Sequence, residues 1–91
     1  MKEYLKPYES LLTSFIDGKI QPVQFEKDYI NLFQDHNSEL TEAEHKIVEE
    51  MFFAVDDFCA DPELREEGDL DEKQLLKEAS RSLEALKKVN L

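Results

Sequence analysis

Apolar residues recur at every third or fourth position in four separate stretches of this chain, and no other feature restricts its fold as strongly. That spacing puts the apolar side chains on one face of an α-helix, whereas a half-buried strand would need strict alternation. The four stretches are residues 2–17, 22–35, 41–61 and 71–88. With 2 glycines and 3 prolines, the chain also lacks the frequent turns of an all-β fold. The sequence therefore predicts an all-α helical bundle, and its length predicts one domain over residues 1–91.

Glycine and proline indicate where these helices begin and end. Pro7 is tolerated only in the first turn of a helix, so the first helix is expected to start close to Lys6. Gly18 favours the left-handed conformation that stops a helix. Because the residue before a proline is pushed out of helical geometry, the third helix is expected to end at Asp61, before Pro62.

Two pairs of residues have the spacing of helix-capping partners. Thr41 and Glu44 stand three apart, so each side chain can satisfy a free backbone amide of the other residue. Asp71 and Gln74 repeat the arrangement at the start of the fourth stretch. Both pairs therefore predict the first residues of a helix.

Negative charge is concentrated between the third and fourth expected helices. The chain has 22 acids and 11 bases, a net charge of −11 at pH 7. Within residues 56–72 the only base is Arg65, and the nine acids are Asp56, Asp57, Asp61, Glu63, Glu66, Glu67, Asp69, Asp71 and Glu72. A field of this sign repels phosphate backbones and anionic lipid, so we expect no direct nucleic-acid partner and no membrane partner.

This acidic stretch has three interpretations. It can be a solvated loop whose charges serve only solubility. It can be a calcium loop, but counting from Asp61 places Arg65 at a liganding position and Gly68 too late for the required turn. It can also be a docking surface for a cationic partner. Asp57 and Asp61 favour docking, because like charges four apart near the end of a helix would lower its stability.

On the docking interpretation, the expected partner is a basic nuclease toxin. Dense carboxylates can occupy the positions at which a nuclease cleft would bind a phosphate backbone, and they speed association with a cationic surface. We expect a monomer that binds the toxin 1:1. The expected toxin-binding residues are Asp56, Asp57, Asp61, Glu63, Glu66, Glu67 and Asp69.

No arrangement of residues indicates an enzyme. Cys59 is the only cysteine and lies in an apolar series, so a buried, inert thiol is expected. His36 and His45 fall in different segments and are interpreted as surface residues. Without a glycine-rich phosphate loop or a zinc-type Cys/His cluster, we expect no catalytic residue, no metal and no cofactor. Since no signal peptide and no apolar run of about 20 residues is visible, the expected location is the cytoplasm.

Two other functions stay open on the residues alone. A helical adaptor could hold a partner helix in a groove formed by Phe52, Phe53 and neighbouring apolar residues, and Phe53 falls off the main apolar stripe. A Mg²⁺-dependent helical hydrolase would need carboxylates that converge inside the bundle. The polar faces expected here argue against the hydrolase.

Several short motifs resemble those of a known family. They are Phe15-Ile16-Asp17-Gly18-Lys19-Ile20, Phe25-Glu26, Tyr29, Val55-Asp56-Asp57-Phe58, Asp61-Pro62-Glu63-Leu64-Arg65 and Leu70-Asp71-Glu72. In their order, and with this length and acidity, the chain resembles the bacterial self-protective colicin-like immunity proteins of the colicin D immunity type. The resemblance spans roughly residues 5–86.

The resemblance implies both a fold and a function. Proteins of this kind are compact antiparallel four-helix bundles that bind a cognate nuclease toxin, often a tRNA-cleaving domain, and block its active site. Immunity proteins of contact-dependent growth inhibition systems are similar in role. The resemblance brings no catalytic residues. It implies framework roles for Val55, Phe58, Leu64 and Leu70.

Overall fold

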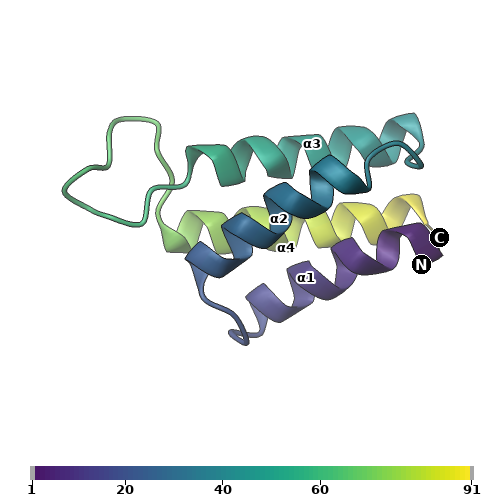
Figure 1. Cartoon of the computed structure of the whole chain (residues 1–91), viewed down its shortest axis with the longest axis horizontal. Helices are drawn as coiled ribbons and strands as arrows, with labels where there is room; N and C mark the ends of the chain where they lie inside the picture. Colours follow the sequence, from purple (N-terminus) through teal and green to yellow (C-terminus); the bar gives the residue numbers. More distant parts are fainter. Residues whose placement is uncertain (1, 91) are drawn as a thin grey trace.

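The computed structural model describes residues 2–90, which fold into four α-helices (Figure 1). After a 3₁₀ turn at Glu3–Leu5, the helices are α1 (Lys6–Ile16), α2 (Pro22–Asp35), α3 (Glu42–Asp57) and α4 (Glu72–Val89). Each helix runs antiparallel to the one before it (Figure 1). Both chain ends and the α2–α3 connection lie at one end of the bundle, and the long α3–α4 loop lies at the other. The expected all-α fold and antiparallel four-helix bundle are confirmed.

Aromatic side chains join α1, α2 and α3 in the core. The rings of Phe15 and Phe25 stack with centroids 4.2 Å apart, and Tyr8 meets Tyr29 edge-on at 5.9 Å. The buried Tyr29 hydroxyl donates a 2.8 Å hydrogen bond to the Val48 carbonyl of α3. Burial raises the pKa of Tyr29, so this hydroxyl remains a donor. On the remaining side α4 closes the core with three fully buried residues, Leu75, Ala79 and Leu86.

The turn that follows α1 has the geometry that its glycine predicts. Pro7 lies in the first turn of α1, as expected, and Gly18 adopts a φ of +77° after the last turn. The Gly18 amide donates to the Phe15 carbonyl at 3.1 Å, and the Lys19 amide donates to the Ser14 carbonyl at 2.8 Å. These two bonds satisfy carbonyl groups that the end of the helix would otherwise leave free.

Both predicted capping pairs are present. The Thr41 amide donates to Glu44 Oε1 at 2.9 Å, and the Glu44 amide donates to Thr41 Oγ1 at 3.2 Å. At α4 the Asp71 amide donates to Gln74 Oε1 at 3.0 Å, and the Gln74 amide donates to Asp71 Oδ1 at 2.9 Å. Sequence spacing alone therefore located the starts of α3 and α4.

Glu44 also connects α3 to residues near both ends of the chain. Its side chain is buried, accepts hydrogen bonds from the Tyr4 hydroxyl at 2.6 Å and from the side-chain amide of Asn90 at 3.4 Å, and lies 3.7 Å from Lys2 Nζ. Burial by itself raises the pKa of Glu44, but the hydrogen bonds from Tyr4 and Thr41 and the charge of Lys2 outweigh it, so the pKa is lowered. One carboxylate thus fastens three parts of the fold together.

The predicted end of the third helix is wrong, because α3 ends at Asp57 and not at Asp61. At Phe58 the backbone becomes extended, with ψ of 131°, and the side chain enters the core with 8% of its surface exposed. Phe58 also pairs with Leu70 in an isolated parallel bridge. These contacts with distant residues end the helix before Pro62 is reached. Asp57 and Asp61 therefore do not share a helical face.

One of the framework roles implied by the resemblance, that of Leu64, is also wrong. Val55 and Phe58 are buried, and Leu70 packs against the core, as expected. Leu64, however, lies in the α3–α4 loop with 71% of its surface exposed. Nothing packs it into the bundle because the loop extends beyond the ends of the helices (Figure 1).

Candidate functional site

Most of the acidic stretch forms a loop that projects from one end of the bundle (Figure 1). We call residues 58–71 the acidic loop. Two backbone hydrogen bonds close its base: the Leu70 amide donates to the Asp57 carbonyl at 2.8 Å, and the Cys59 amide donates to the Leu70 carbonyl at 3.0 Å. The ends of the loop are therefore held together by the main chain, whatever side chains the tip carries.

Arg65, the single base in the stretch, is folded back into the acidic loop. Its Nε and Nη2 atoms donate to the Cys59 carbonyl at 3.2 and 3.0 Å. Within residues 2–90 the ion pairs are Lys2–Glu44 and Glu78–Arg81, and neither includes a residue of the acidic loop. The only cation of the loop thus braces its backbone and forms no ion pair with its carboxylates.

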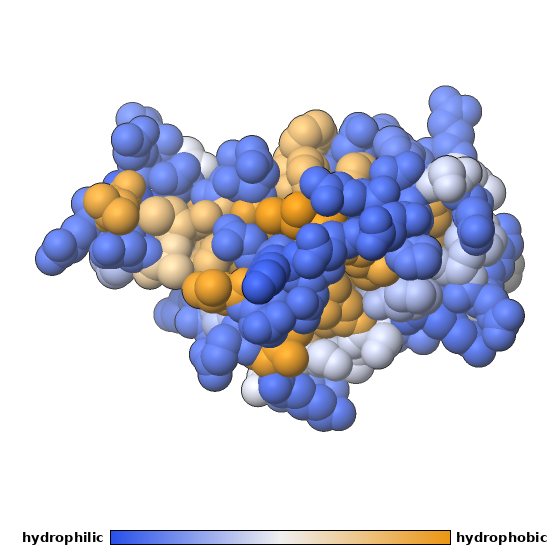
Figure 2. Space-filling view, viewed as in Figure 1, coloured by the Kyte–Doolittle hydropathy of each residue, from blue (hydrophilic) through white to orange (hydrophobic). Residues whose placement is uncertain are grey.

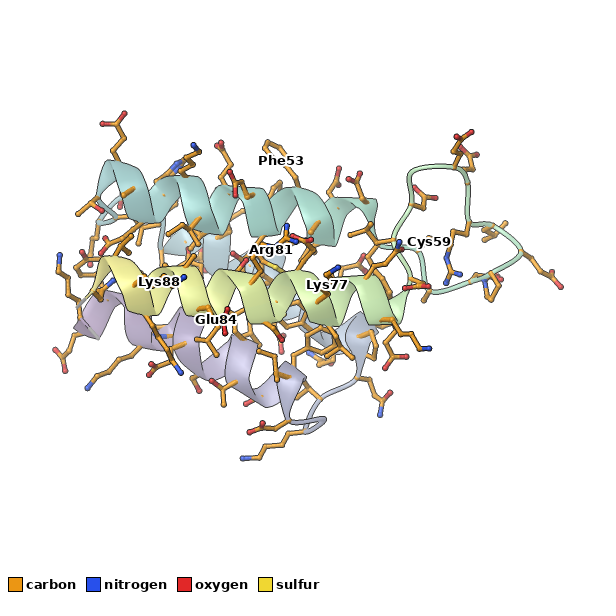
Figure 3. All side chains as sticks on the ribbon, turned by 180° about the vertical axis from the view of Figure 1, so that it is seen from behind. Phe53, Cys59, Lys77, Arg81, Glu84 and Lys88 are labelled. Carbon is orange, nitrogen blue, oxygen red and sulfur yellow. The ribbon has the colours of Figure 1, made fainter. Side chains whose placement is uncertain are left out.

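The structure brings the seven expected toxin-binding residues to this end of the molecule. Asp56 and Asp57 are the last two residues of α3, and both are exposed. In the acidic loop Asp61, Glu63, Glu66 and Glu67 are exposed and Asp69 is half-buried. Acidic side chains leave the loop on several sides (Figure 3), so they surround it and do not form one flat face.

Two of these carboxylates also shape the loop. Asp61 Oδ1 accepts a 2.9 Å hydrogen bond from the Glu63 amide, and Asp69 Oδ2 accepts a 3.0 Å hydrogen bond from the Glu66 amide. Such short-range side-chain bonds replace the backbone pairing that a helix or strand would supply. Asp61 and Asp69 therefore have a structural role besides the expected one in binding.

Glu26, on α2, extends the acidic surface and was missed by the sequence analysis. Partial burial and then the negative charge of Asp56 on α3 raise the pKa of Glu26. The two carboxylates are therefore close enough for the charge of one to act on the other, although they are 30 positions apart in the chain. Nothing in the sequence pattern links them, because their proximity depends on how α2 packs against α3.

The side chains considered for catalysis are separate from one another. Cys59 is half-buried and not fully buried as expected; its thiol donates to the Asp61 carbonyl at 3.4 Å. His36 is exposed, and the His45 ring lies 5.8 Å from that of Phe33 on the bundle. Among residues 2–90, no three His, Cys, Asp or Glu side chains are grouped to hold a metal ion. No helix in that range is both long and apolar enough to cross a bilayer.

The residue that the adaptor interpretation emphasises is exposed, as its position off the stripe predicts. Phe53 is 55% exposed and meets the Phe52 ring edge-on at 6.2 Å. On the neighbouring α4, Figure 3 shows a row of mixed charge along the outer side, made of Lys77, Arg81, Glu84 and Lys88. Phe53 therefore projects from α3 on the side away from α4, one helical turn before Asp57, the last residue of the helix.

Comparison with known proteins identifies the family. No curated protein and no solved structure matches the chain. The family model described as bacterial self-protective colicin-like immunity matches residues 4–86, a range that includes all four helices almost completely and the whole acidic loop. The chain therefore belongs to the bacterial self-protective colicin-like immunity family and is an immunity protein.

Proposed function

We propose that this immunity protein neutralises a basic nuclease toxin by placing the acidic loop in the toxin's cationic substrate cleft. The observation that carries the proposal is the form of the loop: it projects from the bundle, is closed at its base, and bears carboxylates on several sides (Figures 1 and 3). A flat acidic face would suit a flat partner. A projecting, charged loop suits a concave one.

The charges of the loop match what such a cleft offers. A nuclease binds a phosphate backbone through Lys and Arg, and carboxylates form charge-assisted hydrogen bonds with the same groups. Arg65 offsets only one of the nine negative charges of residues 56–72, and its guanidinium is bonded to the Cys59 carbonyl and not to a carboxylate. The remaining negative field speeds the encounter with a cationic toxin and makes association sensitive to salt.

The partner and setting follow from the same proposal. The toxin is a tRNA-cleaving domain of the colicin D kind or a toxin of a contact-dependent inhibition system, bound 1:1 by a monomer in the cytoplasm. Asp56, Asp57, Asp61, Glu63, Glu66, Glu67 and Asp69 contact it. Glu26 joins them, since its carboxylate lies near that of Asp56.

A double substitution tests the proposal. We expect Asp57→Asn with Asp61→Asn to slow association with the toxin about tenfold and to weaken protection of cells, because two charges leave the surface that steers the encounter. The asparagine introduced by Asp61→Asn keeps an oxygen that can accept the Glu63 amide, so the loop keeps its shape. The probe is the toxin domain encoded immediately upstream of this gene, studied by stopped-flow binding and by survival of cells that express it.

The control has the same net charge. Asp35→Asn with Glu39→Gln removes two exposed carboxylates near the α2–α3 connection, at the opposite end of the bundle (Figure 1). This variant should bind at the wild-type rate. Unchanged binding and protection in the Asp57/Asp61 variant would remove both residues from the interface.

The helical adaptor is the second candidate, and the exposure of Phe53 favours it. In that case a partner helix would cover α3 around Phe53, one helical turn before the end of α3. Glu66→Gln with Glu67→Gln separates the two candidates, because both residues lie in the acidic loop and their loss would leave a partner bound at Phe53 unaffected.

A further inference from the structure

A groove of about 470 Å³ lies beside the base of the acidic loop. One wall is the first turn of α2, with Pro22 and Val23, and the other is the loop itself, with Phe58, Ala60 and Arg65. The first turn of α4 adds Glu72 and Lys73 to the lining. Figure 2 shows apolar surface running from the loop toward the start of α2, with hydrophilic side chains around it.

The chemistry of the groove differs from that of the loop above it. Its apolar lining includes Val23, which is 59% exposed, and Phe58, which is almost fully buried. The charged lining residues cancel in sign, with Arg65 and Lys73 opposed by Asp71 and Glu72. An apolar group could therefore enter the groove without facing a net charge, although the surrounding surface is strongly acidic.

The walls of the groove are held in place before any partner arrives. Two hydrogen bonds fix Arg65 to the Cys59 carbonyl, and the bridge between Phe58 and Leu70 fixes the base of the loop. The opposite wall is the start of a helix. A preformed pocket of this kind loses little conformational entropy when it is filled, which favours tight binding.

We infer that this groove receives one large apolar side chain of the cognate toxin, carried beside the Lys or Arg residues that the acidic loop attracts. The inference rests on the proposed function and adds the contact that keeps the complex together. Exposed carboxylates mainly set the association rate, whereas a side chain buried in a pocket inside a polar rim slows dissociation. The acidic loop would thus set the rate of association, and the groove would set the rate of dissociation.

Charge selects the toxin over a second copy of this chain as the occupant. Each copy carries a net charge of −11, and the carboxylates of the acidic loop lie beside the groove in every copy. Two copies meeting at this end would bring like charges together. A cationic partner would instead be attracted by the carboxylates of the loop while its apolar residue enters the groove.

Substitutions that fill the groove or make its lining more polar test the inference. Val23→Trp should fill the groove and raise the Kd for the upstream toxin domain about 100-fold, almost entirely through faster dissociation. Val23→Ser should raise the Kd about tenfold, because the apolar contact is weakened but the space stays open. Both variants should fold normally, since Val23 is 59% exposed. Val89→Trp is the matched control: Val89 is 45% exposed in the last turn of α4, and its variant should bind like the wild type.

Separate outcomes decide the inference and the proposed function. If the wild type binds the toxin with salt-sensitive association and Val23→Trp binds it equally well, the groove is not used and the inference is wrong, while the proposed function stands. If Val23→Trp slows association and leaves dissociation unchanged, the groove also has no role in residence. If the wild type does not bind the toxin at all, the proposed function fails first. Self-association of the wild type that Val23→Trp abolishes, measured by sedimentation without toxin, would assign the groove to a second copy and overturn the inference.

Discussion

Replacement of Glu44 with alanine is expected to lower the free energy of unfolding by about 3 kcal/mol, a large share of the stability of a small domain. The carboxylate is buried and accepts hydrogen bonds from the Tyr4 hydroxyl, the side-chain amide of Asn90 and the backbone amide of Thr41. Alanine would leave these donors without their acceptor and would remove half of the capping box of α3. Urea unfolding followed by circular dichroism measures the change.

The control for this substitution is Glu42→Ala. Glu42 lies in the same first turn of α3 but is exposed, so its loss should remove only the favourable interaction with the helix dipole, about 0.5 kcal/mol. A similar loss of stability in the two variants would mean that Glu44 acts through the dipole alone. The hydrogen bonds to residues near the chain ends would then contribute little.

The pH dependence of stability should also reflect the titration of Glu44. Because the pKa of Glu44 is lowered in the folded protein, its stabilisation is complete above the ordinary glutamate pKa and disappears as pH falls through the lowered value. Glu44→Gln keeps an acceptor oxygen but has no charge to titrate. Between about pH 6 and about pH 2.5 its stability should therefore decline less steeply than that of the wild type. Parallel curves would contradict the lowered pKa.

Removal of four carboxylates around the acidic loop should slow association with the toxin about 100-fold at low salt. The variant combines Asp57→Asn, Glu63→Gln, Glu66→Gln and Glu67→Gln, whose side chains are all exposed. The steering field weakens with each substitution, so the rate should also depend much less on salt between about 50 and about 500 mM. Stopped-flow measurements at several salt concentrations give both quantities.

The stability of this four-site variant should stay the same or rise slightly, because like charges leave a crowded surface and no helix cap is changed. The matched control removes four exposed carboxylates elsewhere on α2, the α2–α3 connection and α3: Asp35→Asn, Glu39→Gln, Glu42→Gln and Glu50→Gln. Both variants have the same net charge. Equal slowing in both would show that overall charge steers the toxin and that the loop has no special part in it.

The features that the sequence predicted correctly are those set by neighbouring residues. Helical periodicity, the left-handed turn at Gly18 and the capping pairs at Thr41 and Asp71 depend on side chains within a few positions of one another. The acidic loop itself was visible as a charge run. Each of these features was therefore readable before any tertiary contact was known.

The features that the sequence missed depend on residues far apart in the chain. The end of α3 is set by the pairing of Phe58 with Leu70, which no local signal announces. The neighbourhood of Glu26 and Asp56 requires α2 to lie against α3. The same holds for the groove, whose walls come from α2, α4 and the acidic loop. Contacts between segments far apart in the chain decide all three, and periodicity carries no information about such contacts.

The main-chain closure at the base of the acidic loop separates recognition from folding. The bonds between Asp57, Cys59 and Leu70 use backbone atoms, so they place few demands on which residues stand at the tip. Changes there alter the charge and shape presented to a toxin while the helices keep their packing. Related immunity proteins could therefore adapt to an altered toxin by changing this short segment, while the four-helix scaffold stays the same.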